Sequence, residues 1–157
     1  MMVFSKASGI MFSVDVSNGD DSKIVIDGIR GLGEYIVLGK VTPNHFVIDK
    51  KSLKIVDKNV VKQTIQLMRG PDGGTVEEAV PEELQDKQVI TDEQVTELAG
   101  YASKIEEHYG CYMDMEYALD VNTNRLWIVQ ARPETFWSQK KKENDTDTDT
   151  GDDNVVA

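Results

Sequence analysis

The sequence predicts an α+β fold, in which a largely antiparallel sheet packs against one long helix and an acidic tail follows. Two patterns carry this prediction. Short segments with alternating apolar and polar residues occur in pairs around turn-forming residues, which is typical of β-hairpins. One longer segment has its apolar residues at the three- and four-residue spacing of a helix instead.

The first predicted hairpin joins residues 8–15 to residues 23–27 around an Asn-Gly-Asp turn at residues 18–20. A Gly-rich stretch, residues 28–34, then leads into a short helix after Glu34. Such a loop can hold a phosphate on its backbone N–H groups, or it can simply connect a strand tightly to a helix. The residues alone leave both interpretations open.

A second hairpin is predicted from residues 46–48 and 53–56, and β character continues over residues 60–68. A Gly-rich loop follows at residues 70–74. The acidic, Pro-containing sequence from there to Asp86 is expected to be irregular and exposed. His45 has no evident partner in the sequence, so we interpret it as a surface histidine.

The clearest helix begins at Thr91, which together with Gln94 has the pattern of a capping box. Gly110 is well placed to end this helix. Its apolar residues recur at helical spacing: Val95, Leu98, Ala99, Ala102, Ile105 and Tyr109. This stripe should pack against the sheet behind the hairpin that follows.

Residues 111–135 are predicted to form a hairpin around residues 122–124, because Asn tolerates the left-handed backbone of tight turns. Alternation places Asp114 and Glu116 on one face of its first strand. In the second strand the same rule places four residues together: Leu126, Ile128, Gln130 and Arg132. Cys111, the only cysteine, lies in an apolar alternation and is expected to be a buried core thiol without a disulfide.

With Thr123 at the centre of the turn, Glu116 falls opposite Gln130 and Asp114 falls opposite Arg132. Directly opposed residues have Cβ atoms roughly 4.5–5.5 Å apart, so these four side chains would converge. Glu and Gln oxygens suit Mg²⁺, and an arginine binds phosphate through two hydrogen bonds. Because such pairs also occur on solvated sheet faces, spacing alone leaves a metal–nucleotide site and ordinary cross-strand pairing both open.

Several segments carry a family resemblance. The sequences MDMEYA and IVQARPET resemble the end of the nucleotide-binding domain of the phosphoenolpyruvate synthase (pyruvate, water dikinase) family. That domain is an ATP-grasp relative, shared with pyruvate phosphate dikinase and rifampin phosphotransferase. GIMFSVD, GLGE and TDEQVTELA also resemble segments of the family.

The resemblance implies roles for individual residues. Glu116 and Gln130 would be ligands of Mg²⁺, and Arg132 would contact the ATP phosphates as the catalytic candidate. Glu34, the last residue of GLGE, and Asp114 would support nucleotide binding. In the family, this domain transfers phosphate from ATP to a histidine on a swivelling domain, and the phosphate then passes to pyruvate, which gives phosphoenolpyruvate, AMP and phosphate.

The resemblance also implies a partial domain. Residues 1–139 would form an ATP-grasp-like lobe, and residues 140–157 would be a disordered acidic tail or linker. The family's N-terminal lobe, with its nucleotide-contacting lysine, and its phosphohistidine domain have no counterpart here and are the expected partners. We therefore expect the isolated chain to be inactive and to bind Mg²⁺-nucleotide weakly, with self-association through apolar surface near residues 1–4.

Two alternatives remain at this point. The chain could be the equivalent lobe of another dikinase-type phosphotransferase, such as an antibiotic-modifying relative. It could instead be a catalytically silent interaction module that keeps the fold. Nucleotide binding distinguishes the silent module from the two phosphotransferases.

Charge and composition narrow the function classes. A net charge of −11 argues against a nucleic-acid partner, because phosphate backbones attract basic surfaces. No apolar run is long enough for a membrane span, and no signal-peptide pattern is present, so a cytoplasmic protein is expected. Residues 143–157 contain six acidic residues and no basic ones. They have little to bury, and their Asp-Thr alternation does not match the register of a calcium loop.

Overall fold

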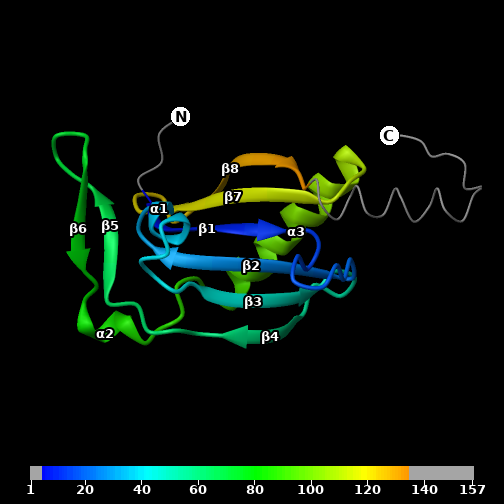
Figure 1. Ribbon diagram of the computed structural model, residues 1–157, viewed down its shortest axis with the longest axis horizontal. Helices are drawn as coiled ribbons and strands as arrows, with labels where there is room; N and C mark the ends of the chain where they lie inside the picture. The colour runs from blue at the N-terminus through cyan, green and yellow to red at the C-terminus, as the bar shows by residue number, and fades with distance from the viewer. Residues whose placement is uncertain (1–4, 135–157) are drawn as a thin grey trace, which may run out of the picture.

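The structure is a computed structural model that describes residues 5–134 (Figure 1). Its main element is a six-stranded sheet in which every neighbouring pair is antiparallel. In spatial order the strands are β4 (Ile55–Asn59), β3 (Asn44–Asp49), β2 (Lys23–Arg30), β1 (Ser5–Phe12), β7 (Met113–Asp120) and β8 (Leu126–Pro133). Together with its helices, this sheet confirms the predicted α+β class.

One long helix covers one face of the sheet, where it lies behind the strands in Figure 1. This is α3 (Asp92–Tyr109). Thr91 caps it as predicted, since the Gln94 N–H donates to Thr91 Oγ1 at 3.1 Å and the Thr91 N–H donates to Gln94 Oε1 at 2.9 Å. Gly110 ends the helix in the left-handed conformation, with φ of 70°.

The main hydrophobic core lies between α3 and the sheet. The helix contributes four fully buried residues: Val95, Leu98, Ala99 and Ala102. The strands contribute alternate residues, among them Met11, Ile24, Ile26, Phe46, Met113, Met115 and Tyr117. A smaller cluster that includes Ile29 and Tyr35 lies on the opposite face, because Ile29 is out of phase with Ile24 and Ile26. Both faces of the sheet are therefore partly covered, and the strands are held firmly in register.

A second, two-stranded sheet consists of β5 (Ile65–Arg69) and β6 (Thr75–Ala79). It stands across the end of the main sheet at which β1 begins (Figure 1). The helix α1 (Glu34–Val37) lies beside it, and α2 (Glu82–Gln85) follows β6. The hydroxyl of Tyr35 donates to Glu77 Oε1 at 2.7 Å, which ties β6 to α1.

The β5–β6 hairpin corrects one prediction. The sequence up to Asp86 was expected to be irregular, but Thr75–Ala79 is a strand paired with β5, and α2 follows it. The residues of β6 are all exposed, so this strand lacks the apolar alternation that normally identifies a strand in a sequence. The β character predicted for residues 60–68 is also confined to β5 in this part of the chain.

Two further expectations change in the structure. Residues Gly28 and Arg30, expected in a loop, belong to β2, so only residues 31–33 connect that strand to α1. Arg30 is 7% exposed, and its Nη2 donates to the backbone carbonyls of Leu84 and Lys87. Its role is to hold α2 and the residues that follow it against β2.

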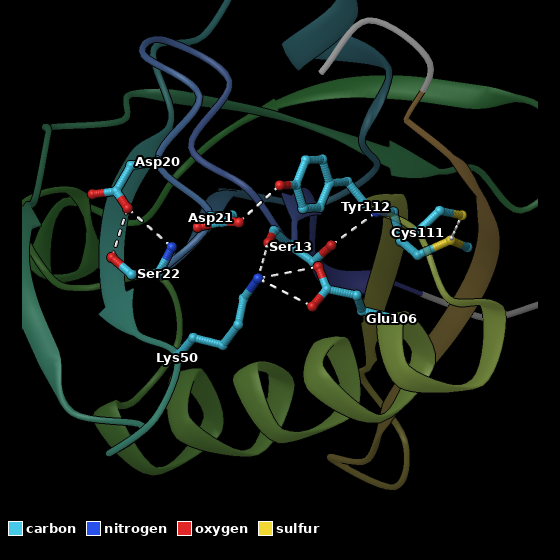
Figure 2. Close-up of polar contacts among 9 residues, drawn as sticks. Ser13, Asp20, Asp21, Ser22, Lys50, Glu106, Cys111 and Tyr112 are labelled. Atoms are coloured by element: carbon cyan, nitrogen blue, oxygen red, sulfur yellow. Dashed lines mark hydrogen bonds and ion pairs between the residues drawn. The ribbon is translucent and has the colours of Figure 1, made fainter. Parts of the chain in front are cut away.

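Lys50 joins segments that are far apart in the sequence, as Figure 2 shows. Its Nζ donates to the Ser13 carbonyl and to Glu106 Oε1 at 3.0 Å. Beside it, the Tyr112 hydroxyl donates to Asp21 Oδ2 at 2.8 Å. The turn after β3, the loop after β1, the end of α3 and the start of β7 are thereby connected at one end of the sheet.

Other predictions are decided only in part. Cys111 is half-buried at the margin of the core rather than fully buried. No helix within residues 5–134 is long and apolar enough to span a membrane. The predicted disordered tail and the apolar surface near residues 1–4 both lie outside the described residues.

Candidate functional site

Four of the five predicted site residues belong to the β7–β8 hairpin and lie on the sheet face opposite α3, whereas Glu34 belongs to α1. In the β7–β8 hairpin, Glu116 is directly opposite Gln130 and Asp114 is directly opposite Arg132, so both predicted pairs are confirmed. The Arg132 Nε donates to Asp114 Oδ2 at 3.2 Å. This bond leaves both Nη groups of Arg132 without a protein hydrogen bond among the described residues, available to bind an anion.

The prediction that Leu126 and Ile128 share a face of β8 with Gln130 and Arg132 is wrong. Leu126 and Ile128 pack against the main core, whereas Gln130 and Arg132 lie with Glu116 on the other face. The register shifts by one residue between the pairs that Glu116 and Tyr117 make, which leaves Val129 as the extra residue of a β-bulge. The bulge allows one strand to supply apolar residues to the core and then polar residues to the site.

Tyr117 anchors the strand that carries Glu116. Its ring lies over Gly9 and Gly28, since a Cβ on either glycine would come within 2.7 Å of the Tyr117 hydroxyl oxygen. That hydroxyl donates to the Asp27 carbonyl at 2.8 Å, and burial raises the pKa of the phenol. Because Tyr117 is fixed on the core side, the neighbouring Glu116 must point to the opposite face.

A surface cavity of about 860 Å³ lies beside these residues. Four of the five predicted site residues line it: Glu34, Asp114, Glu116 and Arg132. Gln130 does not line the cavity, although it is paired with Glu116 across the hairpin. Half-buried Ile10 and Phe12 of β1 add apolar surface. The volume falls within the range of small-molecule sites, roughly 300–1,000 Å³.

The Gly-rich connection contributes less to a phosphate site than its composition allows. The Gly31 N–H donates to the Lys6 carbonyl at 2.9 Å, and the Leu32 N–H donates to the Leu67 carbonyl at 2.7 Å. Gly31 has φ of 77°, and a Cβ there would lie 2.4 Å from the Leu67 oxygen. These two N–H groups are engaged within the protein, so this part of the loop serves as a tight connection that positions Glu34.

The donor set fits a hard cation that also binds phosphate oxygens. In the described part of the chain, no group of three or more His, Cys, Asp or Glu residues is placed to hold a metal ion. Glu116 and Gln130 supply two oxygen donors on opposed positions. Mg²⁺ is commonly bound by one or two carboxylates together with water and phosphate oxygens, so this pair fits it in the presence of a nucleotide.

His45 has a partner that the sequence did not reveal. Its Nδ1 lies 2.6 Å from Asp27 Oδ1, and both residues belong to the same row across the sheet as Ile10 and Glu116. The hydrogen bond to Asp27 raises the pKa of His45, partial burial opposes this, and the carboxylates of Asp27, Asp15 and Asp57 raise it further. At neutral pH the imidazole of His45 is therefore protonated to a greater extent than that of an isolated histidine.

This pair predicts a pH-dependent stability. The folded-state pKa of His45 is raised above 6.5. The contribution of this histidine to the free energy of unfolding is therefore fully present below pH 6.5 and is lost as the pH rises through the folded-state pKa. We expect His45→Gln to lower the unfolding temperature more at about pH 5.5 than at about pH 8.5. An NMR titration should place the His45 pKa above 6.5, and Asp27→Asn should lower it; a pKa at or below 6.5 in the unmodified chain would contradict the prediction.

Arg69 also lines the cavity, although no pattern in the sequence indicates it as a site residue. It comes from β5, which is distant from the β7–β8 hairpin in sequence. The available signal was a basic residue at the end of a strand next to a Gly-rich turn, which is too common to indicate a site. Its placement depends on how the small sheet sits beside α1.

Comparison with known proteins identifies the family. Residues 1–153 match the family model described as pyruvate phosphate dikinase, AMP/ATP-binding domain. The chain is 42% identical over 142 residues to the phosphoenolpyruvate synthase of Escherichia coli (strain K12), with 85% of this chain and 18% of the relative covered. It is 41% identical over 140 residues to a probable phosphoenolpyruvate synthase of Pyrococcus horikoshii, with 85% and 17% covered.

A third relative, the phosphoenolpyruvate synthase of Aeropyrum pernix, is 38% identical over 169 residues, with 90% of this chain and 21% of the relative covered. The chain thus spans about a fifth of the length of the curated relatives it matches. The family match covers nearly the whole chain and includes the hairpin and the Gly-rich connection described above. This chain belongs to the pyruvate phosphate dikinase AMP/ATP-binding domain family.

Proposed function

We propose that this chain is the Mg²⁺-ATP-binding lobe of a phosphoenolpyruvate synthase. One observation carries the proposal: the opposed pairs Glu116–Gln130 and Asp114–Arg132 lie on one face of the sheet, beside a cavity of the size that small ligands occupy. Carboxylate, carboxamide and guanidinium groups are together the chemistry that a metal-bound triphosphate requires. The phosphoenolpyruvate synthases among its relatives support the choice of enzyme.

In this proposal each residue has a defined task. Glu116 and Gln130 hold Mg²⁺, which neutralises phosphate charge when it is bound. Arg132 donates its free Nη groups to the phosphates, and Asp114 orients Arg132 through the Nε bond. Glu34, at the start of α1, lines the same cavity and supports the nucleotide there. Phosphoryl transfer depends mainly on such positioning and charge stabilisation.

The proposal extends to the protein as a whole. In this proposal residues 1–139 belong to an ATP-grasp-like lobe, and residues 140–157 are an acidic tail or linker. An N-terminal lobe and a phosphohistidine domain complete the enzyme, which transfers phosphate from ATP to the histidine and on to pyruvate in the cytoplasm. The isolated chain binds nucleotide weakly and does not turn over. A second candidate is the lobe of another dikinase-type phosphotransferase, because the matching family model is named after pyruvate phosphate dikinase.

Calorimetric titration of ATP, with and without Mg²⁺, tests the proposal. We expect Mg²⁺ to tighten ATP binding by about tenfold, and Glu116→Gln to remove most of this gain because it deletes the anionic ligand. Glu107→Gln, on the exposed surface of α3, makes the same chemical change away from the cavity and should keep the gain. An ATP affinity that is the same with and without Mg²⁺, and the same in Glu116→Gln as in the unmodified chain, would reject the proposed site.

A further inference from the structure

The guanidinium of Arg69 makes few hydrogen bonds within residues 5–134. Its Nε is inaccessible to solvent and has no hydrogen-bond partner among the described residues. The Nη1 donates only to the Gly73 carbonyl, at 3.4 Å, and Arg69 makes no ion pair within residues 5–134. A partly buried guanidinium without a counter-charge is unfavourable, because it loses hydration that nothing replaces.

The acidic residues of the same hairpin have other partners. Asp72 Oδ1 accepts the Gly74 N–H at 3.1 Å within the turn, and Glu77 Oε1 accepts the Tyr35 hydroxyl at 2.7 Å. Arg30 offers a useful contrast, since its Nε is also unpaired but its Nη2 donates to two carbonyls and it does not line the cavity. Arg69 thus differs from a structural arginine in both its bonding and its position.

Arg69 and Arg132 line the same cavity from opposite ends. The Gly31 N–H donates to the Lys6 carbonyl near the start of β1, and Gly31 is bridged to Leu67 of the strand that carries Arg69. Arg132, through its partner Asp114, is aligned with Phe12 at the end of β1. Phe12 is six residue steps along the strand from Lys6, a span of about 20 Å at roughly 3.3 Å per residue. One cation therefore stands at each end of the cavity.

We propose that Arg69 forms a second phosphate-binding subsite of this cavity, remote from the Glu116–Arg132 end. Arg69 lines the cavity, and its Nη groups make only one long hydrogen bond among the described residues, so they can donate to the oxygens of a phosphate. The phosphate is either a group of the bound nucleotide or a separate phosphate ion. This inference rests on the proposed function in that the cavity is taken to receive a phosphate-bearing substrate.

The direct test is an NMR titration that follows the Arg69 Nε–H signal while inorganic phosphate is added to the chain. We expect this signal to shift, and Arg69→Gln to weaken phosphate binding by about tenfold, as for the loss of one charged hydrogen bond. Arg69→Lys should retain part of the affinity, because it keeps the charge but not the planar fork. Arg125→Gln, in the exposed β7–β8 turn and outside the cavity, is the matched control and should bind as the unmodified chain does.

Titrating ATP with Mg²⁺ against phosphate separates the two sources. Competition at Arg69 assigns the subsite to a nucleotide phosphate, whereas simultaneous binding assigns it to a separate phosphate ion. If neither ligand shifts the Arg69 signal, or if Arg69→Gln binds both as the unmodified chain does, the inference is overturned. ATP binding that needs Arg132 but not Arg69, without phosphate binding, overturns this inference alone. A phosphate shift at Arg69 in a chain that binds no ATP rejects the proposed function alone.

Discussion

Gly9→Ala is expected to destabilise the chain by about 3 kcal/mol or more, at the upper end of what overpacking costs. A Cβ on Gly9 would lie 1.8 Å from the Asp27 carbonyl oxygen and 2.6 Å from the Tyr117 hydroxyl oxygen. The first contact is with backbone in the middle of the sheet, so a side-chain rotation cannot relieve it. Strands β1 and β2 would have to separate, and Tyr117 would lose its position over Gly9. Thermal or denaturant unfolding measures the effect.

Gly100→Ala is the matched control for this prediction. It makes the same change within α3, where a Cβ would meet nothing within 4 Å, and should stabilise the helix by up to about 1 kcal/mol. Adding Tyr117→Phe to Gly9→Ala should not restore stability, because the contact with the Asp27 carbonyl remains. An unfolding temperature for Gly9→Ala equal to that of the unmodified chain would show that the sheet packs differently around Tyr117.

Arg132→Ala is expected to weaken ATP binding by about 10- to 100-fold, since a hydrogen bond to a charged group contributes about 1.5–3 kcal/mol. The side chain of Arg132 is 61% exposed and its pair with Asp114 lies at the surface, so the fold should be nearly unaffected. Calorimetric titration of ATP with Mg²⁺ measures the change in affinity, and circular dichroism checks the fold.

Two further variants sharpen this test. Arg132→Lys should recover only part of the affinity, because a lysine cannot bind phosphate through a planar fork. Arg125→Ala removes an arginine from the same hairpin outside the cavity and should leave ATP binding unchanged. Equal affinity in Arg132→Ala and the unmodified chain would remove Arg132 from the nucleotide site.

Local sequence signals predicted the individual elements well. The capping box at Thr91 and the terminating Gly110 defined α3, because both act on the few backbone groups next to them. Alternation defined the strands that have one buried face. It failed at Thr75–Ala79, which is exposed throughout and is recognisable as a strand only through its pairing with β5.

In the β7–β8 hairpin, the pairing of Glu116 with Gln130 was predicted correctly although the predicted centre of the turn was wrong. The sequence placed the turn centre at Thr123, whereas the backbone turn closes between Asp120 and Arg125, with the Asp120 N–H donating to the Arg125 carbonyl at 2.9 Å. Near the turn, each residue of β7 therefore pairs with the β8 residue one position earlier in the sequence than predicted. The extra residue Val129 compensates, so Glu116 still faces Gln130. No local pattern in the sequence announces such a bulge, because it depends on which residues the core accepts.

By itself the sequence determined the fold class, the long helix, the existence of the β7–β8 hairpin and the family. Each of these depends on neighbours within a hairpin or helix, or on motifs. Only the tertiary structure decided that Asp27 orients His45 and that Arg69 reaches the same cavity as Arg132. These relations join strands that are distant in the chain, and they are set by how the sheets pack rather than by any local preference of the backbone.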